Sequence, residues 1–220
     1  NVSDCYAAIA VQGPEAKKLL MTLSGGKALT RENVKNALGT LTMEGRPVRI
    51  AKTGYTGEPI GYELYCESRD ARYFWDRLIE LGARPTALGA RDTLRLEAAM
   101  PLYGHELTDN ITPKMAGLPC KLDGKDFIGH DALVKLGAPE VKRVGLKGVG
   151  RGIVREHCDL YSAPEKIGWT SSGTFAPYLG CCVAMGYVPV EDAEVGKHVY
   201  ADVRGRKVEM EIVPTPFYKR

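Results

Sequence analysis

The sequence lacks long apolar stretches and a strong charge of either sign. No run of about 18 apolar residues occurs, so no membrane-spanning helix is predicted and no membrane partner is expected. The 30 basic and 27 acidic residues leave a formal charge of only +3, without a block of lysine and arginine. This balance argues against a nucleic-acid partner. No signal peptide opens the sequence, which begins at Asn1 and already reads as folded from Val2, so we expect a processed or trimmed chain.

The spacings that bind metals or close disulfide frameworks are also missing. The six cysteines are scattered, and Cys181 and Cys182 are adjacent without forming a CxxC motif. The four histidines show neither HxH nor HExxH spacing. We therefore expect reduced, buried thiols in a cytosol-like compartment, and no metal site.

Two glycine- or serine-rich stretches resemble catalytic motifs without completing them. The stretch from Gly148 to Gly152 lacks the last glycine of GxGxxG, because residue 153 is isoleucine. Ser171 and Ser172 precede Gly173 but are not part of a GxSxG nucleophile elbow. We expect the first stretch to be a turn.

Hydrophobic periodicity predicts alternating strands and helices in the first hundred residues. Strands are expected over 5–11, 48–51 and 62–66, and helices over 14–22, 70–81 and 88–99. The helix over 70–81 is the clearest, with Asp70 as N-cap, Gly82 as its stop and one apolar face formed by Ala71, Phe74, Trp75, Leu78 and Ile79. From about residue 141 the pattern changes to short strands. The best hairpin pairs 199–203 with 208–212 through a turn over 204–207, so the last third is predicted to be a small all-β domain.

Polar residues with potential for chemistry concentrate between residues 53 and 106. Glu63 is an acidic residue in a β-prone segment. It is either a functional acid or an outward, solvated side chain, which is the usual position of glutamate. Arg91 and Arg95 lie four residues apart on a predicted helix, with Asp92 and Glu97 nearby. Pattern alone favours a surface lattice of ion pairs for these four residues.

The same segment resembles a known family. It contains TGYTGE from Thr53, GYELY from Gly61, and LGARDTLRLEAAMPLYGHEL from Leu88, followed by Thr112 and Pro113. Shorter blocks agree with it: VSD from Val2, AVQGP from Ala10, KDFIG from Lys125, AMGYV from Ala184 and PFY from Pro216. Together these blocks resemble the T-protein, or aminomethyltransferase, of the glycine cleavage system, along essentially the whole chain.

The resemblance implies a site for tetrahydrofolate, the co-substrate, in a funnel among three domains. It implies that Glu63 holds the pterin, because a carboxylate accepts two parallel N–H bonds from the amino-pyrimidinone edge. It implies that Arg91 reaches the folate, where a guanidinium suits the carboxylates of that molecule. Tyr55 and Tyr103 are expected as aromatic walls of the site, with a buried core position as the alternative for either, and Tyr218 is a further candidate.

The resemblance also implies the reaction. The one-carbon unit passes from the aminomethyl-lipoyl arm of H-protein, a glycine cleavage system component, to tetrahydrofolate with release of ammonia. The principal catalytic Asp of the family lies in a segment upstream of residue 1, so the catalytic residue stays unknown here. We therefore expect the 220-residue chain alone to be inactive.

The expected fold is α+β, incomplete at the N-terminus, with antiparallel sheets and flanking helices around the folate funnel and a small C-terminal β-barrel or jelly-roll-like domain. The expected division is 1–88 for the second half of domain 1, 89–139 for a piece of domain 2, and 140–220 for domain 3. A bacterial cytoplasmic location is expected, with the mitochondrial matrix as alternative.

The sequence leaves three alternatives to aminomethyl transfer. The first is a folate-binding module without activity. The second is a module of a dehydrogenase that demethylates dimethylglycine or sarcosine, which normally brings a dinucleotide fingerprint that is absent here. The third is an iron–sulfur repair factor, which usually lacks the block from Leu88.

Overall fold

A computed structural model describes residues 1–30, 34 and 36–218 of the chain. The chain divides into two compact units, the first ending at Arg91 and the second beginning at Asp92. Each unit has its own hydrophobic core. The predicted three-part division into 1–88, 89–139 and 140–220 stays a prediction.

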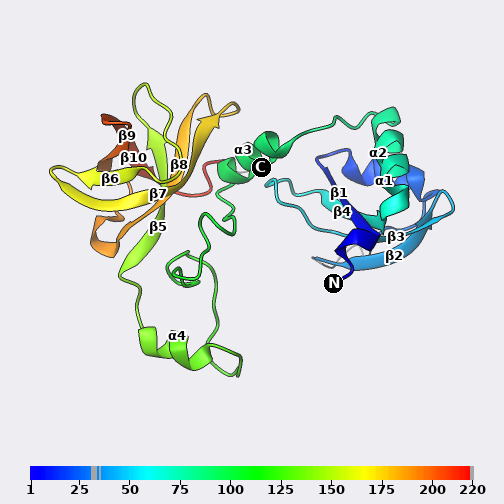
Figure 1. Ribbon diagram of the computed structural model, residues 1–220, viewed down its shortest axis with the longest axis horizontal. Coiled ribbons are helices and arrows are strands. Elements are labelled where there is room, and N and C mark those ends of the chain that lie inside the picture. The colour runs from blue at the N-terminus through cyan, green and yellow to red at the C-terminus, as the bar shows by residue number, and fades with distance from the viewer. Residues whose placement is uncertain (31–33, 35, 219–220) are drawn as a thin grey trace. The chain divides into compact units, whose positions relative to one another are not determined.

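The first unit is built on one antiparallel sheet with the strand order β1–β4–β3–β2 (Figure 1). Its strands are β1 (Tyr6–Gln12), β2 (Leu38–Met43), β3 (Arg46–Ala51) and β4 (Gly61–Glu67). Alternate residues such as Val48, Ile50 and Leu64 are buried against the helices. The residues between them point to the opposite face of the sheet, since side chains alternate along a strand.

Two helices cover the core face of this sheet: α1 (Ala16–Leu23) and α2 (Ala71–Glu80). The predicted helices are confirmed with small shifts in their bounds. Gly82, with φ of 100°, follows α2 as its stop. Asp70 occupies the N-cap position but makes no capping hydrogen bond, because its carboxylate pairs with Arg46 at 3.1 Å.

The predicted apolar face of α2 is only partly buried. Phe74 and Leu78 lie in the core, but Trp75 and Ile79 are each 41% exposed. The apolar face of α2 therefore extends from the core to partly exposed positions at Trp75 and Ile79.

The second unit contains a closed barrel with the strand order β10–β5–β8–β7–β6–β9 (Figure 1). Its strands are β5 (Val141–Gly148), β6 (Asp159–Ser162), β7 (Glu165–Ala176), β8 (Cys181–Pro189), β9 (His198–Val203) and β10 (Arg206–Val213). Helix α3 (Leu88–Glu97) contains the boundary between the units, and α4 (His130–Leu136) precedes the barrel. One-turn 3-10 helices cover Ser3–Cys5, Ser68–Asp70 and Val190–Asp192.

The predicted C-terminal hairpin is confirmed in register, with Val208 opposite Ala201 and Met210 opposite Val199. Its turn is shorter than predicted. Arg204 and Gly205 alone connect the strands, and both adopt positive φ, of 56° and 81°. Two such residues match the twist of a tight hairpin. The sheet of the first unit and the barrel of the second confirm the predicted α+β class, the antiparallel sheets and the C-terminal barrel.

Candidate functional site

Glu63 lies on β4 and points away from the core of the first unit. The residues directly opposite it are Ala10 on β1 and Ala51 on β3. These neighbours share its face of the sheet, and both side chains are small. Glu63 is half-buried, and its Oε2 accepts a hydrogen bond from the Tyr65 hydroxyl at 3.2 Å. The carboxylate therefore lies on the sheet face between two alanines, in contact with the Tyr65 hydroxyl.

Gln12 ties together the motifs that surround Glu63. Its Nε2 donates to the carbonyl oxygens of Thr53 at 3.2 Å and Tyr62 at 2.9 Å. A Cβ added to Gly54 or Gly61 would lie 1.8 or 2.1 Å from the Gln12 Oε1. Glycine at these two positions therefore lets the amide sit between the loop and the strand. In the sequence, Gln12 is noticeable only as part of the block AVQGP, which gives no indication of these hydrogen bonds.

Tyr55 and Arg91 are brought together in the first unit. The Arg91 guanidinium carbon lies 5.7 Å from the centre of the Tyr55 ring, within range of a cation–π contact. Tyr55 is half-buried and Arg91 is exposed. Tyr55 belongs to the loop that joins β3 to β4, and this loop leaves Ala51 and returns at Gly61, at the Glu63 end of both strands.

Tyr103 and Tyr218 belong to the second unit. Tyr103 is 73% exposed and donates to Asp109 at 3.3 Å, so a buried core position is wrong for this residue. Tyr218 is half-buried and packs edge-on against Tyr178, with ring centres 4.5 Å apart and planes at 62°. Both tyrosines stay candidates rather than confirmed site residues.

The predicted surface lattice around Arg95 is wrong. Arg95 is 1% exposed, and its Nη1 donates to Glu106, which is fully buried, at 2.7 Å. Its Nε donates to Asp92 at 2.7 Å and its Nη2 to Ser172 at 2.8 Å. Helical spacing identified the shared face of Arg91 and Arg95 but carried no information on what covers Arg95.

A β-bulge in β7 supplies two hydroxyls to this buried ion pair. The register with β8 shifts between Thr170 and Ser172, so Ser171 is the extra residue. Ser171 donates to Glu106 Oε1 at 2.7 Å, beside the Ser172 contact to Arg95. The two serines therefore hold opposite ends of the pair, a structural role that agrees with the absence of a nucleophile motif.

Glu97, at the end of α3, is a second buried acid of this unit. It is 3% exposed and accepts a hydrogen bond from the Tyr178 backbone N–H at 3.3 Å. Burial raises the pKa of the Glu97 carboxyl above its ordinary value, and the Tyr178 N–H offsets this only in part. Its neighbour Tyr178 is the residue that packs against Tyr218.

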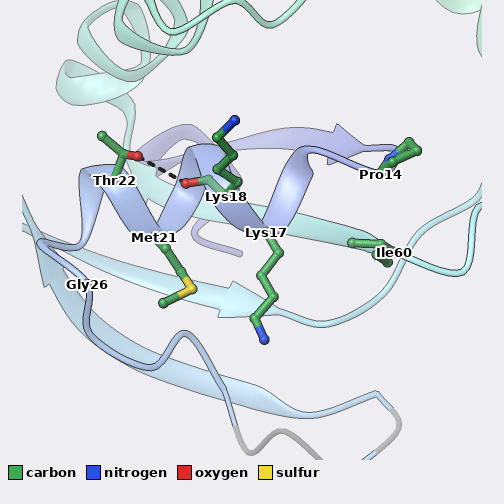
Figure 2. A pocket seen from close by; sticks show the side chains of 7 residues that line it. All are labelled: Pro14, Lys17, Lys18, Met21, Thr22, Gly26 and Ile60. Carbon is green, nitrogen blue, oxygen red and sulfur yellow. Dashed lines mark hydrogen bonds between the residues drawn. The ribbon is translucent and has the colours of Figure 1, made fainter.

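A shallow hollow of about 570 Å³ lies along α1 (Figure 2). Its lining consists of Pro14, Lys17, Lys18, Met21, Thr22, Gly26 and Ile60. The Thr22 hydroxyl donates to the Lys18 carbonyl at 3.1 Å and so is engaged within the helix. No residue predicted for the site lines this hollow, and α1 covers the core face of the sheet rather than the face of Glu63.

Within 1–30, 34 and 36–218, no three His, Cys, Asp or Glu residues are grouped as metal ligands. All six cysteines are free thiols, but only Cys66 and Cys182 are buried and Cys5 is exposed, so the expectation of uniformly buried thiols is wrong. In the same described part of the chain, no helix has the length and apolarity to cross a bilayer.

Comparison with known proteins gives concordant matches. The family model described as the GCVT N-terminal domain matches residues 1–124, and that of the glycine cleavage T-protein C-terminal barrel domain matches residues 142–219. An aminomethyltransferase of Desulforamulus reducens is 41% identical over 229 residues, and one of Halalkalibacterium halodurans is 42% identical over 229. Both alignments cover 100% of this chain and 62% of the relative, so the chain spans less than two thirds of their length.

A solved structure agrees with the fold. The crystal structure of glycine cleavage system aminomethyltransferase T from Bartonella henselae matches with a TM-score of 0.84 at 30% sequence identity. The match covers 97% of this chain and 60% of that chain.

Proposed function

The chain belongs to the glycine cleavage T-protein family, and we propose that it acts as a tetrahydrofolate-dependent aminomethyltransferase. In this proposal the one-carbon unit of an aminomethyl group on lipoylated H-protein is transferred to tetrahydrofolate, and ammonia is released. Relatives of similar sequence carry the name aminomethyltransferase, and this chain contains the GYELY and GARD segments from which the family resemblance was inferred. A bacterial cytoplasmic location and assembly with the other glycine cleavage components are part of the same proposal.

The surroundings of Glu63 are the observation that carries this proposal. Its carboxylate is half-exposed on a sheet face where both directly opposite residues are alanine. The two directly opposite side chains are therefore too small to cover the Glu63 carboxylate against the edge of a flat heterocycle. A carboxylate that accepts two parallel N–H bonds selects an amino-pyrimidinone edge such as that of a pterin.

Arg91 and Tyr55 support the same proposal. An exposed guanidinium beside an aromatic ring offers a positive charge and a flat surface together. We propose that Arg91 interacts with the folate and that Tyr55 forms part of a wall of the site. The work of these residues is to bind and orient two reactants, which lowers the entropic part of the barrier.

Replacement of Glu63 by alanine tests the binding step. The Glu63→Ala variant of the full protein should bind tetrahydrofolate about 1–3 kcal/mol more weakly, because pterin donors lose their acceptor in a desolvated site. Anaerobic isothermal titration calorimetry measures the affinity. Glu67→Ala is the matched control, since Glu67 shares the strand and the face but pairs with Arg69 at 2.6 Å. Equal affinity of Glu63→Ala and wild type would remove Glu63 from the site.

Turnover is tested separately from binding. Aminomethylated H-protein and tetrahydrofolate are supplied together, and the release of ammonia is measured. Ammonia release that depends on both reactants supports the transferase. Folate binding without ammonia release would instead identify a binding module.

A further inference from the structure

Tyr65 makes a side-chain hydrogen bond to Glu63, and the two residues lie two positions apart on β4. Residues at this spacing share one face of a strand, so both point away from the core. The residues directly opposite Tyr65 are Ala8 on β1 and Arg49 on β3. Tyr65 is half-buried on this face, and its hydroxyl oxygen lies 3.2 Å from Glu63 Oε2.

This contact occupies one oxygen of the carboxylate and restrains its rotation. A glutamate side chain has several rotatable bonds and loses conformational freedom when a ligand fixes it. A hydrogen bond already made in the free protein reduces that loss at binding. The carboxylate still has lone pairs available for two donors of a ligand, because each oxygen accepts more than one hydrogen bond.

We propose that Tyr65 is a positioning residue that holds the Glu63 carboxylate in the orientation in which it accepts the pterin edge. This inference rests on the proposed folate-binding role of Glu63. Tyr65 acts through Glu63 and makes no contact of its own with the ligand.

The electrostatics of the pair agree with a lasting donor role. Burial raises the pKa of the Tyr65 hydroxyl, and the negative charge of Glu63 and the hydrogen bond to it raise the pKa further. The phenol therefore keeps its proton throughout the neutral pH range and remains a hydrogen-bond donor to Glu63 there.

A double-mutant cycle tests this role with four proteins: wild type, Tyr65→Phe, Glu63→Ala and the double variant. Phenylalanine keeps the ring and removes only the hydroxyl. Tyr65→Phe should weaken tetrahydrofolate binding about threefold to tenfold in the wild-type background. The freed Glu63 side chain then loses more conformational freedom when it binds the ligand. In the Glu63→Ala background the same change should have no effect, because the group that it positions is gone.

The cycle separates this inference from its rivals. An equal loss in both backgrounds would overturn the positioning role, because Tyr65 would then act by direct contact or through general stability. No loss in the wild-type background would also overturn it. Tyr6→Phe is the matched control, since Tyr6 lies on the same sheet face opposite Glu67, and it should bind folate like the wild type.

A titration without folate tests the pair independently of the proposed function. The absorbance change of tyrosine ionisation near 295 nm, taken as the difference between each protein and its Tyr65→Phe counterpart, isolates Tyr65 among the 11 tyrosines. Glu63→Ala should lower the pKa of Tyr65, since two of the causes that raise it are removed. An unchanged pKa would overturn the positioning contact. A lowered pKa together with a wild-type protein that fails to bind folate would instead overturn the proposed function and, with it, a role in folate binding.

Discussion

Glu97 and Glu106 are both buried acids of the second unit, yet their partners differ. Glu106 accepts from Arg95, from Ser171 and from the Leu102 backbone N–H at 3.0 Å. For Glu97, one backbone N–H at 3.3 Å stands against the cost of burial, and the balance raises the pKa of its carboxyl. The cost of burying the Glu97 carboxylate is therefore offset only in part, and the pKa of its carboxyl is raised.

The pH dependence of stability should report Glu97. Below the ordinary glutamic acid pKa of about 4.3, both folded and unfolded states are protonated and burial carries no charge penalty. Above it, the unfolded state ionises first, so the contribution of Glu97 to the free energy of unfolding falls as pH rises through the raised folded pKa. Urea unfolding from pH 4 to pH 7 should show a smaller fall for Glu97→Gln than for wild type. Parallel curves would contradict the raised pKa, and Glu165→Gln, on an exposed side chain, serves as control.

At the scale of elements, the Arg95 cluster fixes α3 and the segment after it to β7 and β8. Arg95 on α3 reaches Ser172 on β7, and the Tyr187 hydroxyl on β8 donates to the Glu106 carbonyl at 2.6 Å. Burial raises the pKa of Tyr187 to about 12, so this hydroxyl stays a donor. The bulge at Ser171 gives two successive side chains the same direction, which a regular strand would not.

Removal of one member of this cluster should be more harmful than removal of both. Glu106→Leu leaves the Arg95 charge buried without its main partner and should cost about 3–5 kcal/mol of stability. Adding Arg95→Met should recover part of that loss, because both charges of the buried Arg95–Glu106 pair are then absent. Denaturant unfolding measures both, with Asp159→Asn at an exposed 2.8 Å pair as a control expected to cost less than about 1 kcal/mol. A double variant as unstable as the sum of the singles would show that the two charges are not coupled.

Local pattern was sufficient for elements whose apolar residues alternate or recur, such as β4, α2 and the hairpin of β9 and β10. It was insufficient for β2, whose core-facing series begins with Gly39, a residue with no side chain to mark the alternation. A Cβ at Gly39 would lie 2.4 Å from the Leu29 carbonyl oxygen. The close approach of the Leu29 backbone therefore requires glycine at this position. Helix α4 was missed because it is short and has no buried residue to create a periodicity.

The residues of the candidate site also fall into two groups: those that sequence motifs indicated, and those whose contacts only the folded chain shows. The motifs located Glu63 and Arg91 through resemblance, while periodicity alone favoured surface roles for both. Gln12 and Tyr65 were not predicted, because their roles depend on the pairing of β1 with β4 and on a contact that only the folded sheet creates. The burial of Arg95 depends on a barrel strand far along the chain, which spacing within α3 cannot reveal.

For the whole molecule, the separation into two units with separate cores predicts separate responses to core mutations. Leu64 is fully buried in the first unit and Met210 is fully buried in the barrel. Truncation of either to alanine should cost its own unit about 2–5 kcal/mol, through lost burial and the cavity left behind. Native-state hydrogen exchange resolves the two units, since the slowest amides of each report its own opening. Leu64→Ala should speed exchange in β1, β3 and β4, and Met210→Ala should do so in β5, β8 and β10. Equal acceleration in both units by either variant would show that the cores unfold as one cooperative body.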